Sequence, residues 1–169
     1  RKFTASLIEN SQDFLFNVVL IEPEIPNNTG NIGRTCVGTS SKLFLVGKLG
    51  FEINDKHLRR AGLDYWSHLN WCHCPTWDQW WMQVQDPRRV FYFSTKAKNS
   101  VFHAHFQKGD WLVFGKETKG LDRKILEEND AQALFLPQYG PVRSLNVANA
   151  VTVALYEGIR QIKFAAPSI

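Results

Sequence analysis

A turn rich in proline and glycine leads directly into a helix of small residues in the segment Leu136-Pro137-Gln138-Tyr139-Gly140-Pro141-Val142-Arg143-Ser144-Leu145-Asn146-Val147-Ala148-Asn149-Ala150. Small residues allow a helix to pack closely against neighbouring backbone. The side chains of Ser144 and Asn146 at the turn can fix a neighbouring loop or a ligand. Close packing alone also explains the composition, so both interpretations stand at this point.

The helix that follows this turn is predicted to run from about Asn146 to Lys163. Its apolar side chains recur at helical spacing and should form one buried face: Val147, Val151, Ala154, Leu155, Gly158, Ile159 and Ile162. Further helices are predicted at Gly30 to Ser40, after a capping segment Asn27-Asn28-Thr29, and at Thr76 to Val84 and Asp122 to Glu127.

Strands are predicted where apolar, β-branched and aromatic residues run together: Phe16 to Ile21, Leu43 to Val46, Val90 to Phe93, Trp111 to Phe114 and Ala133 to Leu136. Three of these runs are nearly continuous, which is typical of strands buried on both faces of a parallel sheet. The pattern predicts an α/β fold with a mostly parallel sheet flanked by helices.

Composition indicates one globular domain over residues 1–169, with residues 1–15 as an N-terminal extension. Hydrophobic residues make up 44% and charged residues 21% of the chain, far from the composition of disordered proteins. No apolar run is long enough to span a membrane, and three cysteines do not suggest a secreted disulfide framework. We therefore expect a cytoplasmic protein with no membrane partner. The net charge of +4 weakly favours a polyanionic partner.

Two loops follow predicted strands and could bind a ligand. In the first, Pro23 to Arg34, small residues start a helix whose free N–H groups could bind an anion, with Arg34 about one turn into the helix. In the second, Val113 to Asp122, Gly115 and Gly120 could let a ligand approach the backbone closely. An ordinary capped helix and a tight glycine turn explain the same loops.

Several familiar sites are excluded or disfavoured. Leu121 and Asp122 occupy the positions where a nucleotide-triphosphate loop needs Lys and Ser or Thr, and no dinucleotide fingerprint follows a strand. Adjacent residues on a strand point to opposite faces, so a metal site is not expected in the cluster His68, Cys72, His73 and Cys74. The helically spaced Trp77, Trp80 and Trp81 could stack RNA bases, although core packing is the simpler interpretation.

Taken together, three segments resemble the motifs of the SPOUT methyltransferases, and within them the compact tRNA wobble-nucleotide 2′-O-methyltransferases. The resemblance extends from about Asn17 to Gln161 and includes Leu58 to Tyr65 between the first two motifs. It is carried by Asn28-Thr29-Gly30-Asn31-Ile32-Gly33-Arg34, by Phe114-Gly115-x-Glu117-Thr118-x-Gly120-Leu121 and by Arg143-Ser144-Leu145-Asn146-x-x-Asn149-Ala150.

This resemblance implies a C-terminal trefoil knot, which general topology rules would not predict. It implies S-adenosylmethionine as cofactor and S-adenosylhomocysteine as product, with no metal. The second and third motif loops would hold the cofactor side by side, with Asn146 and Glu117 bracing them. The implied cofactor contacts are Phe93, Gly115, Glu117, Leu136, Ser144 and Leu145.

The resemblance also implies a homodimer acting on tRNA. Catalytic roles fall on Arg34, Ser144, Asn146 and Tyr156, and RNA contacts on Asn28, Arg34, Lys116 and Arg143. For Arg34 a hydrogen-bonding and phosphate-positioning role is more consistent with arginine chemistry than a general base. Tyr156 could equally be an interface tyrosine with no chemical role. More basic residues that could meet RNA are Lys56, Arg59, Arg60, Lys96, Lys98, Lys119, Arg123 and Lys124.

Two other functions fit the same residues. One is 2′-O-methylation of ribosomal RNA by the same fold, and the other is a non-catalytic RNA-binding protein that keeps the knot. The intact set of Arg34, Gly115, Glu117, Ser144 and Asn146 argues against lost activity. Binding of S-adenosylmethionine separates the enzyme from the non-catalytic protein.

Overall fold

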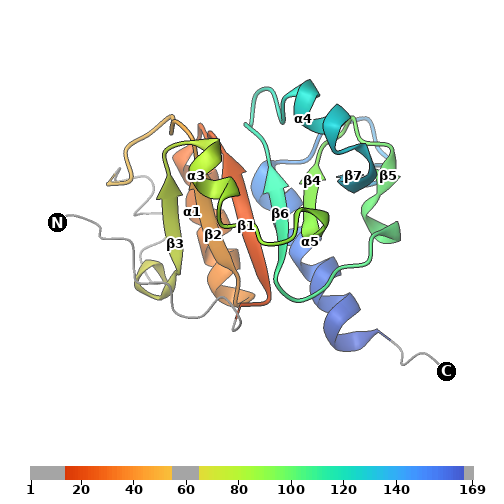
Figure 1. The fold of residues 1–169 in the computed structure, drawn as a ribbon, viewed down its shortest axis with the longest axis horizontal. Coiled ribbons are helices and arrows are strands. Elements are labelled where there is room, and N and C mark those ends of the chain that lie inside the picture. The colour runs from red at the N-terminus through yellow and green to blue at the C-terminus, as the bar shows by residue number, and fades with distance from the viewer. Residues whose placement is uncertain (1–13, 55–64, 166–169) are drawn as a thin grey trace.

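The protein is described by a computed structural model over residues 14–54 and 65–165. Lys56, Arg59, Arg60, most of the Leu58 to Tyr65 segment and nearly all of the predicted extension lie outside these residues. The described chain contains a seven-stranded sheet in the order β3-β2-β1-β6-β4-β7-β5, in which every pair of strands is parallel (Figure 1). The prediction of an α/β fold with a parallel sheet is confirmed.

The five predicted strands are present as β1 (Phe16–Ile21), β2 (Lys42–Val46), β4 (Val90–Phe93), β6 (Asp110–Phe114) and β7 (Ala133–Phe135). Two further strands, β3 (Trp71–Cys74) and β5 (Asn99–Ser100), lie at the two edges of the sheet and were not predicted. Edge strands are only partly buried, so they lack the continuous apolar run that marks the central strands.

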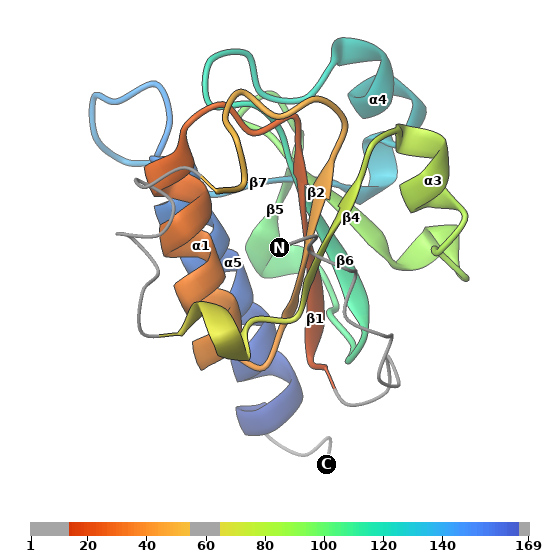
Figure 2. The same cartoon turned by 90° about the vertical axis from the view of Figure 1, so that its left-hand side faces the viewer.

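Helices cover both faces of the sheet, and Figure 2 shows this layering edge-on. On one face α1 (Pro26–Gly38) and α5 (Val147–Ile159) lie side by side, and α3 (Trp77–Trp81) and α4 (Arg123–Glu128) lie on the other. Alternate residues of β1 serve the two cores. Val18 and Leu20 pack with α1 and α5, whereas Val19 packs with Trp80 of α3. Core packing is therefore the role of Trp80.

Helix α1 begins earlier than predicted, and this moves Arg34. The predicted cap Asn27-Asn28-Thr29 is wrong: Ile25 is the N-cap, without a side-chain hydrogen bond, and Pro26 is the first helical residue. Proline suits that position because its fixed φ is helical and it has no N–H to satisfy. Arg34 consequently lies about two turns inside the helix rather than about one.

Helix α5 begins where predicted. The Asn146 side chain accepts hydrogen bonds from the N–H groups of Ala148 (2.8 Å) and Asn149 (3.3 Å), which makes it the N-cap. Beyond Ile159 the chain continues as a π-helical turn, Arg160–Phe164. None of the helices in the described part of the chain is both long and apolar enough to cross a membrane.

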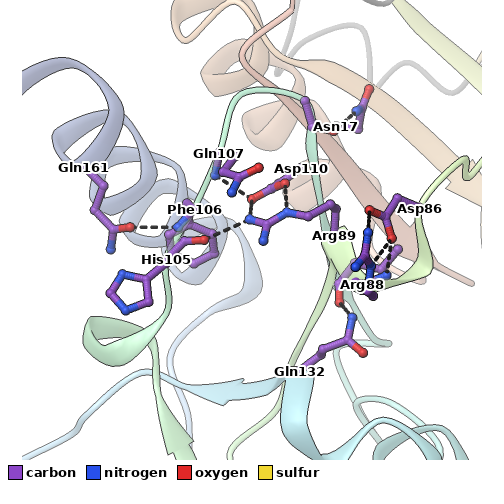
Figure 3. Close-up of polar contacts among 12 residues, drawn as sticks. Asn17, Asp86, Arg88, Arg89, His105, Phe106, Gln107, Asp110, Gln132 and Gln161 are labelled. Atoms are coloured by element: carbon purple, nitrogen blue, oxygen red, sulfur yellow. Dashed lines mark hydrogen bonds and ion pairs between the residues drawn. The ribbon is translucent and has the colours of Figure 1, made fainter.

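An ion pair between Arg89 and the buried Asp110 links the amino-terminal ends of β4 and β6 (Figure 3). Asp110, only 1% exposed at the start of β6, accepts a 2.7 Å hydrogen bond from Arg89 Nε, just before β4. The Gln107 N–H donates to the same carboxylate. This hydrogen bonding raises the pKa of Arg89. The pair joins the starts of β4 and β6, and loss of Arg89 would leave the buried Asp110 carboxylate without its cation.

Candidate active site

A cleft of about 840 Å³ opens at the carboxyl-terminal ends of β4, β6 and β7. Ligands of open parallel sheets bind at this end of the strands. The loop after β6 and the loop from Leu136 to Asn146, distant in sequence, both line it. The structure brings together in this cleft all six residues for which cofactor contacts were predicted: Phe93, Gly115, Glu117, Leu136, Ser144 and Leu145.

The loop after β6 closes on itself at Gly115. A Cβ atom at this position would lie 2.1 Å from the carbonyl carbon of Gly120 and 2.3 Å from the nitrogen of Leu121. Gly120 has φ +66, and its N–H donates to the Lys116 carbonyl at 2.9 Å. A ligand was predicted to approach the backbone here, but at Gly115 the group that approaches is the backbone of Gly120 and Leu121, as in the alternative of a tight glycine turn. The glycines therefore shape the cleft wall.

Glu117 fills the anion site at the start of α1. Its Oε2 accepts from the Glu24 N–H (2.9 Å) and its Oε1 from the Ile25 N–H (3.0 Å). A carboxylate at a helix start is favoured by the helix dipole and by free N–H groups. The anion at this helix start is therefore the chain's own carboxylate and not an external phosphate.

Glu24 completes the link between the first two motif loops. Its carboxylate accepts from the hydroxyl (2.7 Å) and the N–H (3.2 Å) of Thr118. These hydrogen bonds are the main reason that the pKa of Glu24 is lowered. The loop after β1 and the loop after β6 are thus joined in both directions, by Glu117 and by Glu24.

Asn28 and Asn146 connect the third motif loop to the other two. Asn146 Nδ2 donates to Asn28 Oδ1 (3.0 Å), and Asn28 Nδ2 lies 3.5 Å from Glu117 Oε1. The expected bracing by Asn146 and Glu117 is present as hydrogen bonds. Asn28 is only 9% exposed and both ends of its amide are engaged. RNA contact by Asn28 stays a prediction, and its observed contacts are those of a brace.

Arg34 lines a second pocket, of about 480 Å³, that shares Asn28 and Asn146 with the cleft. The pocket is otherwise lined by mostly polar residues of α1 and α5, among them Asn31 and Asn149, for which no role was predicted. The Arg34 side chain is exposed, and its guanidinium carbon lies 5.6 Å from the ring centroid of Tyr65. The arginine thus lies beside the cleft, although not at a helix start.

The remaining predicted residues differ in their exposure and in whether they line the cleft. Arg143 and Ser144 are exposed in the cleft. Lys116 also lines it, but its ammonium pairs with Glu22 at 2.8 Å, and this contact raises the pKa of Lys116. Tyr156 is 56% exposed on α5 and lines neither pocket. The roles predicted for these residues stay predictions.

The cysteine and histidine cluster behaves as alternation on a strand predicts. In β3, Cys74 is buried, whereas His73 is exposed and its Nε2 lies 2.8 Å from the Gly47 carbonyl. Within residues 14–54 and 65–165, His, Cys, Asp and Glu side chains form no group of three or more that could hold a metal ion.

This arrangement of motif loops can be compared with known proteins. The model of the SpoU rRNA Methylase family matches residues 15–156. The chain belongs to this SpoU family. It is 45% identical over 152 residues to the tRNA (cytidine(34)-2'-O)-methyltransferase of Saccharophagus degradans, covering 89% of this chain and 98% of that protein.

Solved structures agree with the SpoU assignment. One, concerned with the 2-OH methylation of C/U34 on tRNA, is 41% identical with a TM-score of 0.82 and covers 88% of this chain and 97% of its own. Another, a SpoU methyltransferase from Streptomyces viridochromogenes in complex with AdoMet, is 26% identical with a TM-score of 0.77, over 89% of this chain and 61% of its own.

Proposed function

We propose that this SpoU-family chain transfers a methyl group from S-adenosylmethionine to the ribose 2′-hydroxyl of the tRNA wobble nucleotide, position 34. One observation carries the proposal: two turns distant in sequence form a single cleft, and the pocket of Arg34 adjoins it through Asn28 and Asn146. The names of the similar proteins support the same reaction and substrate. We propose the cytoplasm as the location of this reaction.

The residues of the cleft fit the cofactor. Its volume of about 840 Å³ lies in the range of small-molecule sites, and Phe93, Phe114, Leu134 and Leu136 offer apolar surface to an adenine ring. The backbone of the Gly115 and Leu136 to Asn146 loops supplies donors and acceptors. We propose cofactor contacts from Phe93, Gly115, Glu117, Leu136, Ser144 and Leu145.

The chain's own groups must place the ribose and manage its proton. S-adenosylmethionine supplies an activated methyl group, so catalysis depends on in-line placement and on polarising the hydroxyl. Arginine is a hydrogen-bond donor and a poor general base, so we assign the guanidinium of Arg34 a hydrogen bond to the reacting ribose or its phosphate. Asn146 would position the loop between the two pockets, and the exposed hydroxyl of Ser144 would contact the reactants.

A homodimer would complete the site. Helices α1 and α5 contact one another through Thr35 and Thr152, whose hydroxyl oxygens are 3.3 Å apart. On α5, Val153 and Tyr156 remain 42% and 56% exposed. Their spacing of three residues places them on one helix face, and we propose that this face packs against a second copy. Tyr156 would then act near the partner's pocket.

Introducing charge on this face should separate the copies. We expect the wild type to sediment with the mass of two chains and Val153→Asp/Tyr156→Asp with the mass of one, because a buried unpaired carboxylate is costly. Met82→Asp, at a still more exposed apolar position on the opposite face of the sheet, should remain dimeric. A wild type that sediments as a monomer at micromolar concentration would refute the dimer.

The extent of the domain and the presence of a knot are also part of this proposal. We propose that residues 1–169 form one SPOUT methyltransferase domain and that the segment from β7 to α5 forms the trefoil knot. In support, β7 is inserted between β4 and β5, whereas α5 returns to pack on α1 and β6. The chain after β7 therefore crosses from one edge region of the sheet to the layer over its centre.

Methylation of defined tRNA tests the function. Purified protein with labelled S-adenosylmethionine should label unmodified tRNA at nucleotide 34, and a tRNA with 2′-deoxyribose at that single position should remain unlabelled. Labelling of ribosomal RNA but not tRNA would favour the ribosomal alternative. Absence of cofactor binding in calorimetry would favour a non-catalytic RNA-binding protein.

A further inference from the structure

Cations near the cleft differ in whether an acidic side chain neutralises them. Beyond the cleft, Arg123 pairs with Glu127 at 2.7 Å, and Lys98 and Lys124 have carboxylate partners at 3.8 Å. Lys116, inside the cleft, pairs with Glu22. A charge already paired gains less from a phosphate, because the existing partner must be displaced or the new anion repelled.

Three exposed cations that line the cleft lack such a partner. Lys96, Lys119 and Arg143 have no carboxylate within 4.0 Å among the residues that the structure describes. Lys119 is near enough to Glu24 to contribute to lowering its pKa, but the Glu24 carboxylate is hydrogen-bonded to Thr118. The three side chains come from the loops after β4, β6 and β7, so exposed cations from three separate loops line the cleft.

The cofactor alone does not explain three free cations. S-adenosylmethionine has one carboxylate but also a sulfonium and an ammonium group, so three unpaired cations around it would disfavour its binding. A nucleic-acid backbone supplies one negative charge per nucleotide, and neutralising these phosphates releases counterions. The positive charge of these three residues is therefore more complementary to RNA than to the cofactor.

We propose that Lys96, Lys119 and Arg143 form a phosphate-binding rim that holds the tRNA backbone over the cleft, whereas Lys98, Arg123 and Lys124 contribute little. This inference rests on the proposed function, since it names the surface by which that site takes tRNA. The sequence named Lys96 and Lys119 among several basic residues that could meet RNA, and the ion pairs of the structure now select these two and Arg143 from that group.

Salt dependence of tRNA binding distinguishes the two sets of cations. Dissociation constants for unmodified tRNA are measured over a series of KCl concentrations for Lys96→Gln, Lys119→Gln and Arg143→Gln. The slope of log Kd against log salt should fall by about 0.7–0.9 for each rim variant. Arg123→Gln and Lys124→Gln remove the same formal charge from paired positions, and their slopes should match the wild type.

Two outcomes would overturn the proposal that these residues bind the tRNA backbone. One is an equal loss of slope in the paired controls, which would mean that net charge and not position determines binding. The other is a loss of S-adenosylmethionine affinity in calorimetry with an unchanged salt slope, which would assign the cations to the cofactor. A wild type that does not bind tRNA at any salt concentration would instead refute the proposed function itself.

Discussion

Replacing Arg34 with alanine should reduce methyl transfer to tRNA by about 100-fold to 10,000-fold, the range of a positioned proton-transfer or polarising group. Affinity for S-adenosylmethionine should stay within about twofold of the wild type, because Arg34 lines the neighbouring pocket and not the cleft. Single-turnover transfer and calorimetry measure the two quantities. The side chain is exposed, so folding should be little affected.

Two further variants sharpen this test. Arg34→Lys keeps the charge but loses the planar fork, so it should remain strongly impaired if hydrogen-bond geometry matters. Arg88→Ala removes an exposed arginine that pairs with Asp86 (Figure 3) and lines neither pocket, so its activity should equal the wild type. Turnover near the wild-type rate in Arg34→Ala would remove this residue from the mechanism.

Gly115→Ala should cost both cofactor binding and stability. The added Cβ would lie within 2.5 Å of three backbone atoms of Gly120 and Leu121, which cannot move aside like the end of a flexible side chain. The loop would have to open, lowering the free energy of unfolding by about 1–3 kcal/mol, as overpacking usually does. Misplacement of the cleft wall should weaken S-adenosylmethionine binding by about 100-fold. Calorimetry and thermal unfolding report these effects.

Gly140→Ala is the matched control, because it makes the same change in the other loop of the cleft. A Cβ at Gly140 meets no atom within 4 Å, and the residue does not have a positive φ. Its cofactor affinity and unfolding temperature should therefore resemble the wild type. Tight cofactor binding by Gly115→Ala would show that the contact with Gly120 is not needed for the cleft.

The hydrogen bonds among Asn28, Glu117 and Asn146 give the two pockets a shared frame. Asn28 and Asn146 line both pockets, and Glu117 ties the loop after β6 to the start of α1. A change in one loop therefore reaches the other pocket through short polar contacts. This explains why a methyl donor and its acceptor could be held in fixed relation by segments far apart in sequence.

Local patterns were sufficient for most of the secondary structure. The buried central strands have continuous apolar runs, and the Asn146 side chain caps α5 as its residue type suggests. Local patterns failed at the edge strands β3 and β5, which are only partly buried. They also failed at the start of α1, where the partner of the free N–H groups is Glu117, a residue far along the chain.

The sequence by itself determined the α/β class, the central strands and the three motifs, because these depend on neighbouring residues and on spacing along the chain. Only the tertiary structure decided that Glu117 occupies the helix start, that the backbone of Gly120 presses on Gly115, and which cations remain unpaired around the cleft. Each of these depends on distances between residues remote in sequence. Hydrogen bonds and ion pairs act over a few ångströms of space, whatever the separation along the chain.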